Sequence, residues 1–254
     1  MAILTREEAQ GILKKALSFS KSDECTVSLK GSEGGNVRYA RNAVSTTGDI
    51  SKMTLDINTA FGKKSGNTSI YEFDDASLER AMRRAEELAK LAPDNPEYMP
   101  LPGPQSYPES VTYKKSTGEL DADSRADYVA KSLQAAKENG LDAAGYMENK
   151  TAFYALMNSK GLFAYNIDTS VAFSVTLRNA EGTGSGYAGK SMGDITKLDT
   201  FALTKIAASK AKNSIGAKAL EPGKYTVILE PMAAGDLLDN LFSEYNNGMN
   251  ARLV

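Results

Sequence analysis

The chain has 254 residues, with 30 lysines and arginines against 32 aspartates and glutamates and a formal net charge of −2. This balance argues against a nucleic-acid-binding protein or one held to an anionic membrane, and a hydrophobic content of 41% excludes a wholly disordered chain. Because apolar runs of about 18 residues and a secretory signal pattern are both missing, we expect no membrane segment and no secretion.

Cysteine and histidine usage narrows the possible chemistry further. Cys25 is the only cysteine, so an internal disulfide is impossible, which is typical of a cytoplasmic protein. Cys25 alternates with Val27 and Leu29, and we expect it to be a buried strand residue. The sequence contains no histidine, which removes the HExxH and HExxxH zinc sites, the Ser-His-Asp triad and the Cys-His dyad together.

Residues 1–92 carry the patterns of an α+β sheet domain. Thr5 and Glu8 form a capping box before a helix expected over 6–18. Asp74 or Asp75 is expected to cap a second helix, whose buried stripe runs from Leu78 to Leu91. Between the helices we expect a strand over 25–30, a glycine-rich turn over 31–35, a returning strand over 36–40, a strand around 53–57, a turn over 62–66 and a strand over 67–73.

A proline-rich segment divides the sequence. Six of the eight prolines lie between Pro93 and Pro108, and we interpret residues 93–108 as an extended interdomain linker. The predicted fold class is therefore α+β, with an N-terminal α+β sheet domain over 1–104, which includes the linker, and the first part of a β-rich second domain over 109–254. In that second part we expect a helix from Asp121 or Asp123 to residue 140, strands over 145–147, 151–158 and 162–178, a helix over 200–213, a strand over 225–229 and a helix over 232–244.

Four local sequences, taken in their order along the chain, resemble the TldD/TldE (PmbA) family, whose members have been described as modulators of DNA gyrase. They are residues 38–42 followed by Ser45 and a hairpin, residues 158–161, the glycine-rich run 182–186, and residues 221–231. The resemblance implies a peptidase family in which active members hold zinc on an HExxxH helix, completed by a downstream cysteine. It also implies dimers that enclose a chamber for unfolded peptides, with the metal only in the TldD-type partner of the two-protein version.

The stretch that matches the zinc helix departs from the family pattern. Asp239 stands in place of the first histidine, Asn240 in place of the glutamate and Glu244 in place of the second histidine. Two carboxylates five residues apart on a helix diverge by about 140°, so they face one another poorly. We therefore expect no metal in this chain, a closer likeness to the metal-free TldE/PmbA type, and a polar helix stripe opposite buried Leu237, Leu238 and Leu241. The resemblance implies that family members normally continue about as far again beyond Val254, so the second domain is expected to be incomplete, in either a truncated chain or a homologue that has lost half of this domain.

Gly182, Gly184 and Gly186 are the candidate substrate-binding residues, because a glycine-rich strand can accept an extended peptide by strand addition. The alternatives are a turn, an edge approached by another backbone, or a phosphate-binding loop. The acidic pairs at residues 74–75 and 121–123 are explained by helix capping.

These patterns lead to one main functional hypothesis and two alternatives. We expect a TldE/PmbA-like subunit of a TldD/TldE-type metalloprotease, with an unfolded peptide as substrate, a TldD-type protein or a second copy as partner, and neither nucleic acid nor membrane. No cofactor is expected in this chain, and zinc is expected only in the TldD-type partner. The alternatives are a non-enzymatic peptide-binding or scaffold protein derived from that family, and a histidine-free hydrolase of the Ser/Lys type.

Overall fold

The computed structural model describes residues 2–108 and 110–245. It falls into two compact units, one that ends at Gly216 and one that begins at Ala217. The described residues form helices α1 (Arg6–Ser18), α2 (Asp75–Leu91), α3 (Lys115–Gly118), α4 (Ala122–Glu138), α5 (Thr200–Asn213) and α6 (Pro231–Tyr245), and a short 3₁₀ helix, η1 (Ile195–Lys197). The strands are β1 (Glu24–Ala40), β2 (Ala43–Phe61), β3 (Lys64–Ile70), β4 (Asp142–Asn158), β5 (Phe163–Arg178) and β6 (Ser185–Met192).

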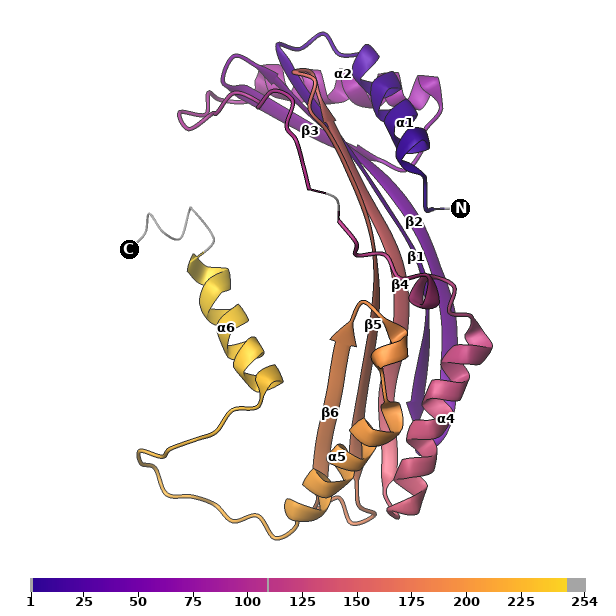
Figure 1. Ribbon diagram of the computed structural model, residues 1–254. Coiled ribbons are helices and arrows are strands. Elements are labelled where there is room, and N and C mark those ends of the chain that lie inside the picture. Colours follow the sequence, from indigo (N-terminus) through magenta and orange to yellow (C-terminus); the bar gives the residue numbers. More distant parts are fainter. Residues whose placement is uncertain (1, 109, 246–254) are drawn as a thin grey trace. The chain divides into compact units, whose positions relative to one another are not determined.

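The first unit is built on one long, curved sheet, shown in Figure 1. Its six strands are ordered β3-β2-β1-β4-β5-β6, and every neighbouring pair is antiparallel. With 19 residues, β2 spans roughly 60 Å. The helices and the antiparallel sheet together confirm the predicted α+β class.

Helices cover both ends of one face of this sheet (Figure 1). At one end α1 and α2 pack over a core that includes Val27 and Leu29 of β1. At the other end α4 and α5 pack over a second core that includes Val37 and Tyr39. Successive strand residues point to opposite faces, so these four odd-numbered residues all lie on the same face of β1. The middle of that face is therefore flanked by helices on both sides.

The expected turn over 31–35 is wrong, because β1 runs without interruption from Glu24 to Ala40. The chain reverses instead at Arg41 and Asn42, which have φ of 51° and 58° and form a tight two-residue hairpin turn with β2. The glycines of β1 serve close packing rather than a turn. A Cβ on Gly31 would lie 1.9 Å from the carbonyl oxygen of Ala2, and a Cβ on Gly35 would lie 2.2 Å from the guanidinium of Arg125.

The helix starts predicted from capping patterns are confirmed. Thr5 and Glu8 form the reciprocal capping box of α1. Asp74 caps α2 by accepting from Ser77 N–H at 3.0 Å, and Asp121 caps α4 by accepting from Ser124 N–H at 2.8 Å. These caps depend on residues within three positions of each other, which is why sequence alone located them.

The proline-rich segment is packed on the sheet. The Leu101 N–H donates to the Glu24 carboxylate at 3.0 Å, and the Asn158 side-chain amide donates to the Pro102 carbonyl at 2.9 Å. Further along, the Thr169 N–H donates to the Thr112 carbonyl at 3.3 Å. Strands from both sides of the segment pair directly, since β1 lies beside β4. Strands from before and after the segment therefore belong to one sheet, and the expected division into two domains stays a prediction.

The second unit contains α6 but not the expected strand over 225–229, which is extended chain without strand pairing. Val227 and Ile228 are 70% and 97% exposed. A strand needs the backbone of a neighbour, and none pairs with these residues within the part of the chain that the structure describes. The expected burial of Leu237, Leu238 and Leu241 is also wrong, because all three are exposed in α6. The asparagine and glycine positions 246–248 lie outside the described residues.

Cys25 is buried in the core under α2, as expected, and is 1% exposed. Burial raises the pKa of its thiol to about 11. Because the thiolate is the reactive species, we predict that iodoacetamide at pH 8 modifies the folded protein very slowly and the urea-unfolded protein rapidly. Intact mass spectrometry over time would measure both rates. Rapid, complete labelling of the folded protein would contradict the burial of this thiol.

Candidate functional site

A band of polar residues crosses the sheet between the two apolar cores. On β1 the odd-numbered positions change from Val27 and Leu29 to Glu33 and then back to Val37. Glu33 pairs in register with Ser51 of β2 and with Thr151 of β4. Thr151 pairs in turn with Thr169 of β5. Four neighbouring strands thus place polar side chains in one row on the face that carries the helices.

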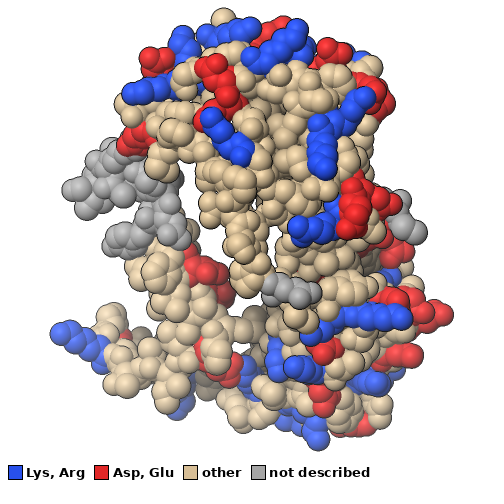
Figure 2. All heavy atoms as spheres, turned by 45° about the horizontal axis from the view of Figure 1, so that its top comes forward, with Lys and Arg blue, Asp and Glu red and all other residues tan. Residues whose placement is uncertain are grey.

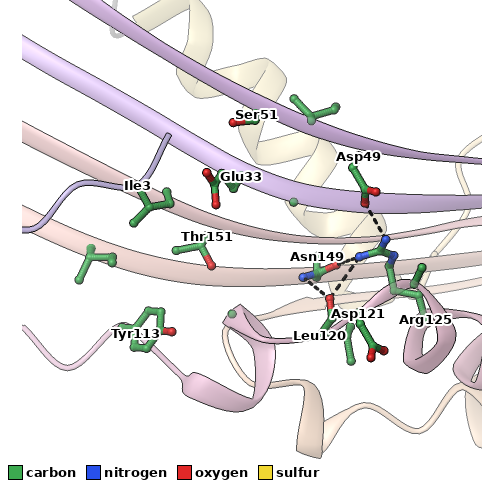
Figure 3. Close-up of a pocket in the computed structure, with 15 residues that line it drawn as sticks. Ile3, Glu33, Asp49, Ser51, Tyr113, Leu120, Asp121, Arg125, Asn149 and Thr151 are labelled. Atoms are coloured by element: carbon green, nitrogen blue, oxygen red, sulfur yellow. Dashed lines mark hydrogen bonds and ion pairs between the residues drawn. The ribbon is translucent and has the colours of Figure 1, made fainter. Parts of the chain in front are cut away.

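This polar band forms the floor of a pocket of about 620 Å³, shown in Figure 3. A volume of this size is typical of ligand sites. The pocket lies where the helix layers leave the sheet uncovered, and the loop before α4 closes one side of it. Its lining includes Ile3, Glu33, Asp49, Ile50, Ser51, Tyr113, Asp121, Arg125, Asn149, Thr151 and Ile167.

Arg125 of α4 anchors one wall of the pocket. Its guanidinium donates to Asp49 Oδ1 at 2.7 Å, to Asn149 Oδ1 at 2.9 Å and to the Leu120 carbonyl at 3.2 Å, as the dashed lines in Figure 3 show. The side chain is 5% exposed, and its Nε–H is buried without a hydrogen-bond partner among the described residues. A buried, unpaired donor of this kind is costly, so an acceptor brought to it would be stabilised.

Other polar groups of the pocket retain hydrogen-bonding capacity. Thr151 is only 8% exposed, yet its hydroxyl makes no hydrogen bond within the described chain. Figure 3 shows Thr151 and Glu33 projecting from neighbouring strands on the pocket side of the sheet. Glu33 accepts one hydrogen bond, from the Ala2 N–H, which leaves its second oxygen available.

The pocket carries an excess of negative charge. Its lining contains three carboxylates, of Glu33, Asp49 and Asp121, against the single guanidinium of Arg125. Side-chain and backbone hydrogen bonds from Ser124 lower the pKa of Asp121, so this carboxyl stays ionised at neutral pH. The single guanidinium of Arg125 pairs with Asp49 and also helps to lower the pKa of Asp121, whereas Glu33 has no cationic partner in the pocket lining. Elsewhere, on the face that Figure 2 displays, charges of both signs alternate.

The candidate substrate-binding glycines lie in the turn before the edge strand β6 and at its start, and Gly184 and Gly186 pack against α5. Gly182 has φ of +69° in the turn between β5 and β6. A Cβ on Gly184 would lie 2.5 Å from the Ala211 carbonyl oxygen, and one on Gly186 would lie 2.1 Å from the Ala207 carbonyl oxygen. These two glycines therefore allow the α5 backbone to approach the sheet, which was one of the alternatives drawn from the sequence.

The outer edge of β6 is partly blocked at this point. The Ser214 hydroxyl accepts from the Ser185 N–H at 2.8 Å and donates to the Ser185 carbonyl at 3.0 Å. Lys210 Nζ donates to the Tyr187 carbonyl at 3.0 Å. A peptide strand added at this edge would have to displace the Ser214 and Lys210 side chains, because the strand edge beside Ser185 is not free. Peptide binding at Gly182, Gly184 and Gly186 stays a prediction.

Asp239, Asn240 and Glu244 lie together on α6, in the second unit. The Asn240 amide donates to the Asp236 carbonyl at 2.8 Å within the helix, while the side chain of Glu244 lies outside the described residues. An aspartate and an amide do not supply the imidazole or thiolate ligands that a three-ligand zinc site prefers, so the donor set does not fit zinc. Within the described part of the chain, no group of three or more His, Cys, Asp or Glu side chains is placed to hold a metal ion.

The pocket on the sheet was not predicted from the sequence. Its signal was present in the strand patterns, since Asn149 and Thr151 interrupt an odd-numbered apolar series that contains Met147 and Phe153. The interpretation of residues 31–35 as a turn concealed the same interruption at Glu33. Arg125 looked like an ordinary charged helix residue, because nothing near it in sequence indicates that Gly35 leaves room for its guanidinium.

Comparison with known proteins identifies the central part of this fold. Residues 107–215 match the family model described as the PmbA/TldA metallopeptidase central domain. This segment is a PmbA/TldA-type central domain. The matched segment runs from the end of the proline-rich region through α5, so it includes Arg125, Asn149 and Thr151 of the pocket, whereas Glu33 and Asp49 precede it. No curated protein sequence matches this chain.

Solved structures of similar fold carry TldE and gyrase-modulator names. TldE from Thermococcus kodakarensis has a TM-score of 0.72 and 17% identity, covering 80% of this chain and 47% of that protein. A modulator of DNA gyrase from Thermotoga maritima has a TM-score of 0.72 and 18% identity, covering 84% and 50%. Another from Bacteroides thetaiotaomicron has a TM-score of 0.77 and 19% identity, covering 95% and 58%.

The chain therefore spans about half the length of the solved TldD/TldE-type structures that it matches. At these identities the likeness extends to the fold. Among the described helices, none combines the length and apolar character needed to cross a bilayer.

Proposed function

We propose that this chain is a metal-free, TldE-type subunit that holds an extended, unfolded peptide for a TldD-type zinc peptidase. In this proposal the partner supplies the zinc-bound water and the general base, while this chain supplies binding surface and orientation. The complex would act in the cytoplasm, where a lone buried thiol such as Cys25 stays reduced.

One observation carries the proposal: a metallopeptidase-type central domain occurs in a chain without histidine. The α6 positions that correspond to the zinc helix carry an aspartate, Asp239, and an amide, Asn240, which already donates a hydrogen bond within α6. This pair of side chains is unsuited to binding zinc. A family fold without metal ligands favours a binding role, because binding and orientation can contribute to catalysis without a reactive group. The solved TldE structure of similar fold supports the assignment to the TldE type.

The test is reconstitution with a TldD-type protein that carries an HExxxH helix and comes from the same genome. We expect cleavage of unfolded peptides to rise at least tenfold when this chain is added, to vanish with a zinc chelator, and to coincide with a heteromeric complex in light scattering. Equal cleavage with and without this chain would overturn the proposal. That result, combined with peptide binding by this chain alone, would favour the peptide-binding scaffold instead.

A further inference from the structure

We propose that the pocket between the two helix layers binds the basic side chain of a lysine or arginine residue in an extended peptide. The inference rests on the proposed function for the identity of the ligand as a peptide. The basic character of the bound residue is inferred from the pocket itself. The charge of the lining, its unused hydrogen-bonding groups and its apolar walls each fit an alkyl chain that ends in a cation.

The charge of the lining selects a cation. Glu33, Asp49 and Asp121 outnumber the one guanidinium of Arg125, which pairs with Asp49 at 2.7 Å, and Glu33 has no cationic partner in the lining. Glu33 and Asp121 come from β1 and from the cap of α4, so a cation between the sheet and α4 would experience both charges. Charge-assisted hydrogen bonds of this kind are roughly twice as strong as neutral ones.

The unused hydrogen-bonding groups of the pocket floor suit a basic side chain. The Thr151 hydroxyl and the second Glu33 oxygen can accept from an ammonium or guanidinium.

The remaining walls suit the hydrocarbon part of the ligand. Ile3, Ile50 and Ile167 line the pocket, and Tyr113 adds an aromatic ring. Lysine and arginine bury their methylene groups on apolar surfaces while the charged group stays in a polar environment. A tyrosine ring also attracts a nearby cation. The pocket therefore combines an apolar lining for the stem with carboxylates for the head.

The experiment measures binding by the isolated full chain, without any partner, by fluorescence anisotropy. Three labelled, otherwise neutral ten-residue peptides would carry lysine, arginine or norleucine at one central position. We expect the lysine and arginine peptides to bind at least tenfold more tightly than the norleucine peptide, and this preference to decline as salt increases.

Two variants test the pocket residues. Glu33→Gln keeps an acceptor for the Ala2 N–H but removes the charge, and we expect it to abolish most of the preference for the basic peptides. Thr151→Val keeps the shape and removes the hydroxyl, and we expect about threefold weaker binding. Glu87→Gln on α2, where the side chain is 66% exposed, is the matched control and should leave affinity unchanged. Equal thermal midpoints would establish that all variants are folded.

Several results would overturn the inference, and they are separable from failure of the proposed function. Equal binding of the three peptides, or an unchanged preference in Glu33→Gln, removes the pocket assignment while leaving a peptide-holding subunit intact. If n-butylamine displaces the labelled lysine peptide as effectively as the unlabelled lysine peptide does, the pocket binds free amines and does not select a residue within a peptide. Reconstitution that fails while the basic preference is present would remove the peptidase role and leave the pocket assignment standing.

Discussion

A Gly186→Ala variant is expected to lose about 3 kcal/mol of unfolding free energy, at the upper end of the range for overpacked sites. The added methyl group would lie 2.1 Å from the Ala207 carbonyl oxygen and 2.5 Å from the Ala211 N. Both atoms belong to the α5 backbone, which cannot rotate away as a side chain can. The helix must therefore move off β6, and this movement opens the core formed by Ala207, Ala208 and Ala211. Urea unfolding followed by circular dichroism would measure the change.

Gly11→Ala is the matched control for that experiment. Gly11 lies inside α1, and a Cβ there would meet nothing within 4 Å. Alanine is favoured over glycine in a helix interior by about 1 kcal/mol, so this variant should be slightly stabilised. If Gly186→Ala unfolds at the same urea concentration as the wild type, α5 does not lie against β6 as described.

The same geometry affects how peptide binding at the glycine-rich run can be tested. A valine at position 184 would overlap the Ala211 carbonyl oxygen and displace α5. Reduced peptide binding by this variant would therefore reflect the displaced helix and not the loss of a contact between the peptide and Gly184. Ser191→Pro is a better probe of the strand edge. Because Ser185 N–H points outward to Ser214, odd-numbered N–H groups of β6 face away from β5, and proline at position 191 removes one of them without breaking the ladder.

Features set by neighbouring residues could be predicted from the sequence, whereas features set by distant residues could not. The caps Thr5, Asp74 and Asp121 were located because their partners lie three positions away. The glycines at 31, 34 and 35 were misread as a turn because their actual partners are more than 80 residues further on, or at Ala2. The same long-range packing accounts for the candidate site, since Glu33, Thr151 and Arg125 converge only when β1 pairs with β4.

The expected strand over 225–229 illustrates a related limit. Tyr225, Val227 and Ile228 have strong β propensity, but propensity describes how a residue fits a sheet and does not supply the neighbouring strand. In the second unit, as far as it is described, these side chains are exposed and the backbone is unpaired. The segment is largely apolar, as the sequence shows, but the state it adopts depends on a pairing surface outside these residues.

The buried cation of the pocket gives the second large expected effect. We predict that Arg125→Ala lowers the unfolding free energy by about 3 kcal/mol, since hydrogen bonds to charged groups contribute about 1.5–3 kcal/mol and the vacated space adds a cavity. The lost guanidinium would leave Asn149 Oδ1 without its donor and would remove the link between α4 and β2. Arg84→Ala is the control, because Arg84 is 66% exposed and its ion pair at 3.9 Å should contribute less than about 0.5 kcal/mol.

Asp49→Asn separates the ion pair from the hydrogen bonds. The Asp49 side chain is 78% exposed, so solvent screens its charge, and an asparagine oxygen can still accept from Arg125. We therefore expect a loss of about 1 kcal/mol, well below that of Arg125→Ala, with a small dependence on salt. A loss equal to that of Arg125→Ala would mean that the Asp49 charge, and not the buried contacts to Asn149 and Leu120, holds the guanidinium in place. In that case the order of this pocket wall would depend on one exposed carboxylate.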